Sequence, residues 1–324
     1  MTSLNFRNGA ATLLSAGLLL GSCNYSGAPE NAQNSPQNVD DTAIRFGAPL
    51  FHFDYHAVSE LSVAKMDPNT GDHWAVRLQK DHEGRWLISG APDGRVLSDH
   101  LANSNFVDHL LDTLRTFTLL SLAPNASAET IGLSPPRFSI RWTAEGKQHE
   151  IQIGDGAYSR VPTLSDRTYV GQGALFGMLD YLKAFSVLRL PTLCDFAADD
   201  MDEIEMGPGT SARWYAQREG GRWTDRKHRR LGSTGAITME DRLSGVVHTR
   251  IRDYLDDADV ARDWAGRIEH SPFATVTLKD RAGKATVIRV VRAEFQGQRE
   301  LMGTISSRPG AVFVLYPEAL RFFE

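Results

Sequence analysis

The sequence predicts an α+β fold made of two tandem copies of one module, each an antiparallel sheet packed on one main helix. Two observations carry this prediction. Each half of the chain has short segments in which apolar and polar residues alternate, and one longer segment whose apolar residues recur at helical spacing. In addition, the motif "EGRW" at Glu83–Trp86 returns as "GGRW" at Gly220–Trp223, so that Trp86 recurs 137 positions later as Trp223.

Further matches extend this repeat. The offset of 137 relates the two helical stripes and one pair of strands, and an offset of 136 relates another pair of strands. The last strands of the two copies correspond after a few inserted residues. The matched positions are Phe106, Leu110, Leu114 and Phe117 with Leu243, Val247, Ile251 and Tyr254; Ile151 and Ile153 with Ile288 and Val290; Phe138, Ile140 and Trp142 with Ala274, Val276 and Leu278; and Tyr169-Val170 with Phe313-Val314. Because few residues are identical, two unrelated segments with the same element order are the alternative interpretation.

The first copy begins with strands. Leu61 and Val63 alternate with polar residues, and so do the apolar residues of Trp74–Leu78, which predicts a strand pair joined at the turn-like "DPNTGD", Asp67–Asp72. A third strand begins at Trp86, directly after a glycine-containing turn.

A helix follows these strands. Phe106, Val107, Leu110, Leu111, Leu114 and Phe117 form its apolar stripe, and Ser104 or Asn103 can cap its start. "SPP" at Ser134–Pro136 then breaks the chain before two more strands, Phe138–Trp142 and Glu150–Ile153.

In the second copy, the predicted helix runs from about Met239 to Asp256. The predicted strands are Phe273–Leu278, Thr286–Val291 and Ala311–Leu315. The two copies are predicted to join near Pro191, which gives modules at residues 44–191 and 192–324.

The N-terminus has the pattern of an export signal. Arg7 is its only charge before the uncharged, mostly apolar stretch Gly9–Leu20, which is too short to span a bilayer. The sequence Leu20-Gly21-Ser22-Cys23 resembles the lipobox of bacterial lipoproteins. That resemblance implies a signal peptide at residues 1–22 and a mature chain that begins at an acylated Cys23 and is held in a membrane by its lipids. An ordinary secretory signal, or a buried helix with a chance cysteine, is the alternative.

The segment after Cys23 favours a tether. Residues 24–41 are rich in Asn, Gln, Ser, Pro and Gly, so residues 23–43 are predicted to be a disordered spacer. By the enterobacterial sorting rule, Asn24 favours the periplasmic face of the outer membrane, with the outer leaflet of the inner membrane as the alternative. Once Cys23 is acylated, Cys194 has no partner for an intramolecular disulfide. The formal net charge of −5 gives no sign of nucleic-acid binding.

The first copy also resembles a known bacterial family. "IGLSPPRFSIRW" at Ile131–Trp142, "HEIQIG" at His149–Gly154 and the strand with Tyr169-Val170 are similar to the domain of unknown function 4340. The family's Gly-Leu-x-x-Pro step matches Gly132–Pro136, and the second copy lacks this step. The resemblance covers most of residues 44–323. It implies an exported or membrane-anchored protein without an established enzymatic activity, in some members similar to proteins encoded beside ABC transporters of the gliding-motility type.

The sharpest candidate for chemistry is "FHFDYH", in which His52, Asp54 and His56 alternate and would share one face of a strand. Two imidazoles and a carboxylate are suitable ligands for Zn²⁺ or another divalent ion. The alternative is that these three residues form the solvent-exposed face of a strand whose other face carries buried aromatic residues. "DPNTGD" is similar to the start of a calcium loop, but no acidic residue closes it at the right spacing, so a turn is favoured.

Two charged runs are weaker candidates. Asp195–Glu205 crowds carboxylates near the predicted join, where a solvated linker is the favoured interpretation and a cation site the alternative. The basic run contains Arg226, Lys227, Arg229 and Arg230, which could contact anionic lipid headgroups or an acidic partner. A solvated loop is the favoured interpretation for this run as well.

Two functions of different classes follow from the sequence. The first is a lipid-anchored, non-catalytic binding or scaffold module whose sheet edges, or a cleft between the copies, contact a protein partner in the cell envelope. The second is a metal-dependent hydrolase that uses His52, Asp54 and His56. The first is favoured, and no cofactor is predicted for it.

Overall fold

The computed structural model describes residues 44–66, 71, 73–92, 96–123, 127–182, 184–210 and 214–324. The predicted signal peptide, Cys23 and the tether lie outside the described residues, as does most of the predicted turn at Asp67–Asp72. The described residues belong to one compact unit. Within them, none of the helices combines the length and apolar character needed to cross a bilayer.

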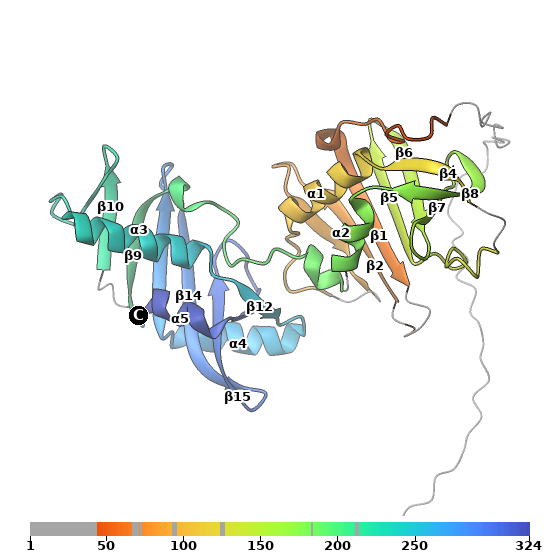
Figure 1. Cartoon of the computed structure of the whole chain (residues 1–324). Coiled ribbons are helices and arrows are strands. Elements are labelled where there is room, and N and C mark those ends of the chain that lie inside the picture. The colour runs from red at the N-terminus through yellow and green to blue at the C-terminus, as the bar shows by residue number, and fades with distance from the viewer. Residues whose placement is uncertain are drawn as a thin grey trace, which may run out of the picture. The chain divides into compact units, whose positions relative to one another are not determined.

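The first half of the chain forms an eight-stranded antiparallel sheet with the strand order β3-β2-β1-β5-β6-β7-β8-β4 (Figure 1). Helices α1 and α2 lie together on one face of this sheet (Figure 1). The elements are β1 (Val58–Met66), β2 (His73–Lys80), β3 (Trp86–Gly90), α1 (Ser104–Arg115), β4 (Thr118–Leu122), β5 (Phe138–Ala144), β6 (Lys147–Ile153), β7 (Tyr158–Val161), β8 (Ser165–Gln172) and α2 (Leu175–Tyr181).

The second half repeats this topology, with the strand order β11-β10-β9-β13-β14-β15-β16-β12. The elements are β9 (Met201–Pro208), β10 (Trp214–Glu219), β11 (Arg222–Thr224), α3 (Ser233–Val247), β12 (Ile251–Tyr254), α4 (Ala258–His270), β13 (Ala274–Asp280), β14 (Ala285–Phe295), β15 (Gln298–Ile305), β16 (Phe313–Leu315) and α5 (Leu320–Phe323). Strand for strand, the two orders are the same. The predicted α+β fold with a tandem duplication is therefore confirmed.

Strand pairing supports the predicted repeat offsets. Ile140 of β5 lies opposite Ile151 of β6, and Val276 of β13 lies opposite Ile288 of β14, so these strands are related by offsets of 136 and 137. The alternation predicted for β1 is also present, because Leu61 and Val63 are fully buried. The side chain of Asn103 caps α1 by accepting a hydrogen bond from the amide of Phe106.

The second helix begins at Ser233, before the predicted start near Met239, and ends before the predicted end near Asp256. α3 ends at Val247, and Ile251 and Tyr254 lie on β12 instead of on the helix. A duplicated hydrogen bond gives the correct helix register: the indole of Trp86 donates to Asp108 on α1, and the indole of Trp223 donates to Glu240 on α3. The tryptophan precedes its carboxylate by 22 residues in the first copy and by 17 in the second. The repeat offset of the helices is therefore five residues smaller than the offset of 137 that relates the two tryptophans.

The prediction of one main helix for each sheet is too simple. α2 packs beside α1, and α5 packs beside α3 (Figure 1). α4 has no helical counterpart in the described part of the first module and contacts β14 and β15. Val290 belongs to the core under α3, whereas Val291 belongs to a separate cluster with α4. Since successive strand residues point to opposite faces, α4 covers the second face of this sheet.

In the first module, the place of α4 in the chain is taken by the loop before β5. The backbone carbonyl of Ile131 in this loop accepts a hydrogen bond from the amide of Asp155 at 2.7 Å. Gly154 lies directly under that carbonyl, since a Cβ atom there would lie closer than 3.0 Å to the oxygen. Gly132 has a φ of +68°, a conformation that favours glycine. The Gly-Leu-x-x-Pro and Ile-Gly motifs therefore form one close backbone contact.

The outer strands of both sheets are covered by flanking segments. The backbone of β3 exchanges hydrogen bonds with His100 and Ala102, and β4 is flanked by residues 47–50, which bond to Phe117 and Leu119. Residues 191–193 flank β12 in the same way, and residues 230–231 bond to β11. The sheet edges suggested as docking sites by the sequence are thus largely occupied by the chain itself.

Candidate functional site

The predicted strand with His52, Asp54 and His56 is absent. Residues 51–54 are not in a strand, and Tyr55–Ala57 form a short 3-10 helix whose start is capped by Asp54, which accepts a hydrogen bond from the backbone amide of His56. The His56 ring lies on the Tyr55 ring instead. Among the described residues, no group of three or more His, Cys, Asp or Glu side chains could hold a metal ion. The structure therefore corrects the predicted strand, and it does not bring His52, Asp54 and His56 together as one set of ligands.

The aromatic residues of the same segment have a structural role. Phe51 and Phe53 are buried against Trp142 of β5, with ring centroids 4.8 and 5.5 Å from that of the indole. The alternating pattern thus reflects two buried phenyl rings, as the alternative interpretation expected, although the backbone is not a strand.

The acidic run Asp195–Glu205 is not a free linker. Its second part lies in β9, where Glu203 pairs with Lys279 at 2.5 Å and Glu205 pairs with Arg226 at 2.5 Å. These carboxylates have cationic partners within the second module. The interpretation of the whole run as a solvated linker is therefore wrong.

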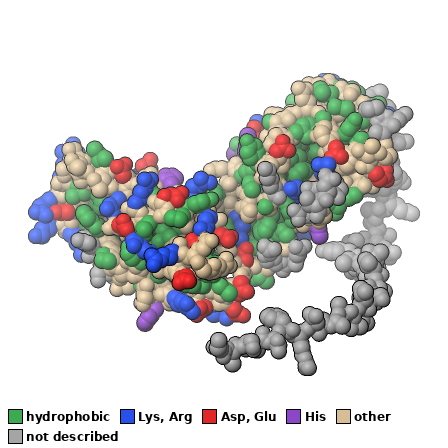
Figure 2. Space-filling model, turned by 60° about the horizontal axis from the view of Figure 1, so that its bottom comes forward, with side chains coloured by type: hydrophobic (Ala, Val, Ile, Leu, Met, Phe, Trp, Pro, Cys, Tyr) green, Lys and Arg blue, Asp and Glu red, His purple; other side chains and the backbone are tan. Residues whose placement is uncertain are grey.

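Two arginines of the basic run, Arg226 and Arg229, have carboxylate partners. Besides the Arg226 pair, His228 contacts Glu219 at 2.6 Å and Arg229 contacts Asp225 at 2.6 Å. The guanidinium of Arg229 and two backbone amides lower the pKa of Asp225 to about 2. Figure 2 shows Lys and Arg side chains (blue) at this end of the second module, where β10 and the start of α3 lie. Lys227 and Arg230 are exposed, and their contact with a lipid or partner stays a prediction.

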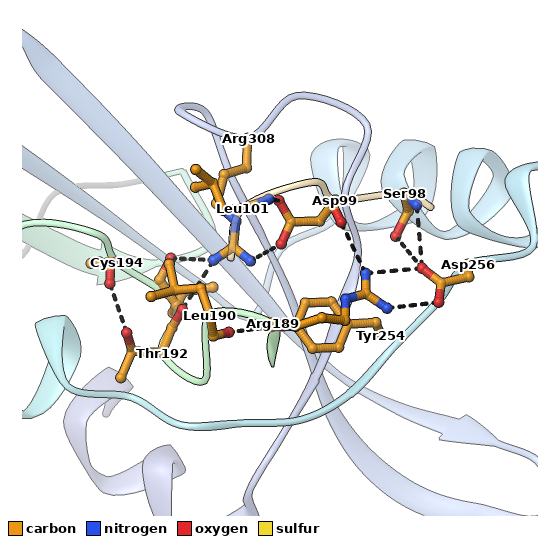
Figure 3. Close-up of polar contacts among 11 residues, drawn as sticks. Ser98, Asp99, Leu101, Arg189, Leu190, Thr192, Cys194, Tyr254, Asp256 and Arg308 are labelled. Carbon is orange, nitrogen blue, oxygen red and sulfur yellow. Dashed lines mark hydrogen bonds and ion pairs between the residues drawn. The ribbon is translucent and has the colours of Figure 1, made fainter. Parts of the chain in front are cut away.

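A buried polar network joins the segments around the predicted join of the two modules (Figure 3). Arg189 is 3% exposed, and its guanidinium contacts both carboxylate oxygens of Asp256 at 2.7 and 3.0 Å. The guanidinium also lies over the Tyr254 ring, 3.5 Å from its centroid. Ser98 donates to Asp256 through its amide and its hydroxyl group. Residues from both modules thus share one ion pair.

A second buried guanidinium completes this junction network. Arg308 pairs with Asp99, and both side chains are at most 4% exposed. Arg308 also donates to the backbone carbonyls of Thr192 and Leu193 at 3.0 Å (Figure 3). Two arginines and two aspartates balance in charge, as burial of charged groups requires. Burial raises the pKa of the nearby Tyr254 to about 12, so this phenol stays protonated and donates to the Leu190 carbonyl.

No local signal in the sequence points to the junction network. Ser98 and Asp99 lie between β3 and α1, Arg189 lies between the modules, and Asp256 and Arg308 come from two later loops. Only the tertiary fold brings these positions together. The connection that contains Ser98 and Asp99 lies within the stretch that is five residues longer than its counterpart in the second module.

Cys194 lies beside this network and is buried. Burial and the charge of Asp195 raise the pKa of its thiol to about 12, against an opposing effect of Arg308. We therefore expect Cys194 in the folded Cys23→Ser chain to resist thiol reagents at pH 8, where about one thiol in ten thousand would be ionised. Labelling with a chromogenic disulfide, in buffer and in denaturant, measures this. Rapid stoichiometric labelling of the folded chain would contradict the expectation.

The second module also has a groove between α3 and the segment that contains α5. Its volume is about 770 Å³. It is lined by Arg242, Arg250, Arg321, His248, Asp241 and Glu318, together with small and aromatic residues. The two helical segments approach closely because Phe322 packs on Gly245, where a Cβ atom would lie closer than 3.0 Å to the ring. This groove has the size of a ligand site.

Comparison of the chain with protein-family models, with curated proteins and with solved structures found no match. The duplicated fold, the junction network and the groove are therefore interpreted from their own geometry.

Proposed function

We propose that this chain is a bacterial envelope lipoprotein that acts as a non-catalytic binding or scaffold module. The junction network is the observation that carries the proposal. Buried ion pairs, Arg189 with Asp256 and Arg308 with Asp99, tie segments of the first module to loops of the second. Such contacts suit a protein that offers surfaces of two modules to a partner at a fixed separation.

The position in the cell follows from the sequence. The lipobox at Leu20–Cys23 and the polar spacer after it support acylation of Cys23 and attachment to a membrane. We favour the periplasmic face of the outer membrane, with the outer leaflet of the inner membrane as the alternative. The partner is a protein of the cell envelope. Membership in the family of the domain of unknown function 4340 would favour a complex associated with an ABC transporter.

Substitution of Cys23 tests the anchor. We expect Cys23→Ser to move the chain from the membrane fraction to the soluble fraction and to abolish labelling with a palmitate analogue, since the acylated thiol is lost. Fractionation followed by immunoblotting measures the first effect, and in-gel detection of the analogue measures the second. Cys194→Ala is the matched control, because it removes the other cysteine and should leave the chain in the membrane fraction. A Cys23→Ser chain that stays fully in the membrane contradicts the anchor.

The same preparation tests the scaffold function. After gentle detergent extraction, the wild-type chain should elute in a complex with an envelope protein, which mass spectrometry identifies. Recovery of the free monomer alone, from cells in which the chain is at its natural level, would contradict the scaffold proposal.

A further inference from the structure

We propose that the groove between α3 and α5 binds an acidic peptide segment of a partner protein. The inference rests on the proposed function for the existence of a protein partner, and it adds the chemistry of the contact. It is carried by three arginines that line the groove, Arg242, Arg250 and Arg321.

Each of these guanidinium groups lies over an aromatic ring. Arg250 lies 5.6 Å from the centroid of Tyr316, Arg321 lies 4.6 Å from that of Phe322, and Arg242 lies 5.5 Å from that of Trp214. In the described part of the chain, none of the three forms an ion pair, although Arg242 also donates a hydrogen bond to the sulfur of Met206 at 3.7 Å. Because a ring face takes none of the N–H groups, Arg250 and Arg321 keep theirs available for a planar carboxylate.

This arrangement differs from that of the other basic surface. In the basic run, Arg226 and Arg229 already have carboxylate partners, Glu205 and Asp225. Of the four basic residues of this run, only Lys227 and Arg230 would meet an incoming anion without displacing a partner. In the groove, none of the three arginines has a described carboxylate partner. Charge complementarity therefore favours the groove over the basic run as an anion-binding surface.

Other residues of the groove favour a peptide over a phosphate-rich membrane surface. Asp241 and Glu318 also line it, and both are exposed. A lipid surface presents a continuous layer of phosphates that these two carboxylates would repel. A peptide can place its own carboxylates at the arginines and its backbone amides or a basic side chain at Asp241 and Glu318. The buried Ala319 and the half-buried rings of Tyr316 and Phe322 supply apolar contact for its aliphatic parts. The groove thus fits an extended segment in which carboxylates alternate with small apolar residues.

The binding test uses the full chain with Cys23→Ser, so that acylation cannot anchor it. The probe is a capped peptide of alternating Glu and Ala, and a Gln-Ala peptide of the same length is the uncharged control. We expect the Glu-Ala peptide to bind more tightly at low ionic strength, with an affinity that falls as salt is added. Arg250→Gln and Arg321→Gln should each weaken binding about three- to fivefold, and the double variant about tenfold or more.

Arg229→Gln is the matched control, because it removes the same charge from an exposed arginine of the basic run. It should change the affinity less than about twofold. Equal binding of the two peptides, or an equal loss in Arg229→Gln, overturns the inference. Vesicles with anionic phospholipid form the second arm of the test. If the vesicles bind through Arg250 and Arg321 and the peptide does not bind, the groove is a lipid site and the inference is overturned.

The inference and the proposed function fail in different ways. If the chain that carries both Arg250→Gln and Arg321→Gln does not differ from wild type in peptide binding but still co-purifies an envelope partner, the groove assignment is wrong and the scaffold function stands. If the peptide binds through these arginines but no partner is recovered from membranes, the scaffold function is wrong.

Discussion

Asp99→Ala is expected to lower the free energy of unfolding by about 3–5 kcal/mol, because it leaves the guanidinium of Arg308 buried without its carboxylate. Both side chains of this pair are at most 4% exposed, so bulk water screens the unpaired guanidinium poorly. The two carbonyl groups that accept from Arg308 remain, but neither carries a full charge. Urea unfolding followed by circular dichroism measures the loss.

The same variant should also change how the chain unfolds. Asp99 belongs to the first module, whereas Arg308 belongs to a loop between β15 and β16. If this pair couples the two modules, the wild-type chain unfolds in one transition, and Asp99→Ala separates it into two. Calorimetry shows this directly. A variant with a single unshifted transition would mean that the pair contributes nothing to the coupling.

An exposed pair provides the control for this prediction. Asp263 and Arg267 on α4 form an ion pair at 2.8 Å, with side chains 59% and 61% exposed. Asp263→Ala should cost at most about 0.5 kcal/mol, because water screens the charges. A double variant, Asp99→Leu with Arg308→Met, should recover much of the loss in Asp99→Ala, since it removes both charges together. If the double variant loses as much free energy of unfolding as Asp99→Leu and Arg308→Met lose together, burial of an unpaired charge is not the cause of the instability.

How far the sequence can predict this structure depends on how local each signal is. Alternation within β1 and β5 determines which residues face the core, so the prediction of these strands is confirmed. The predicted register of the second helix is wrong because the connection before this helix is shorter than the one in the first copy. Residue spacing alone cannot detect that difference in length. The alternation of His52 and His56 is misleading, since the burial of Phe51 and Phe53 produces the same pattern without a strand.

The candidate surfaces are harder to predict than the fold. Arg189 and Arg308 are ordinary surface residue types in the sequence, and only the packing of distant loops buries them. The basic run and Asp225 are visible because they are adjacent in the sequence. The partners of Arg226 and His228, which are Glu205 on β9 and Glu219 on β10, are not visible in this way. In contrast, the arginines of the groove come from two helical segments and the position just before β12, so no motif unites them.

Gly154→Ala is expected to cost about 3 kcal/mol or more, because the site has no room for a methyl group. A Cβ atom at this position would lie closer than 3.0 Å to the Ile131 carbonyl oxygen and 3.0 Å from the Leu133 side chain. Since the nearest atom belongs to the backbone, the loop itself must move to make room for the methyl group. That movement would break the 2.7 Å hydrogen bond that the amide of Asp155 donates to the carbonyl of Ile131. Thermal and urea unfolding of the variant measure the loss.

The second module explains why the glycine is specific to the first. The repeat offset of 137 places Val291 at the position of Gly154, and Val291 is buried against α4, where a side chain is needed to fill the contact. Gly177→Ala in α2 is the matched control: nothing lies within 4 Å of the point that its Cβ atom would occupy, and alanine favours a helix, so the variant should be neutral or up to about 1 kcal/mol more stable. If Gly154→Ala is as stable as Gly177→Ala, then the loop before β5 does not pack on β6 through a close backbone contact, and the Ile-Gly motif needs another explanation.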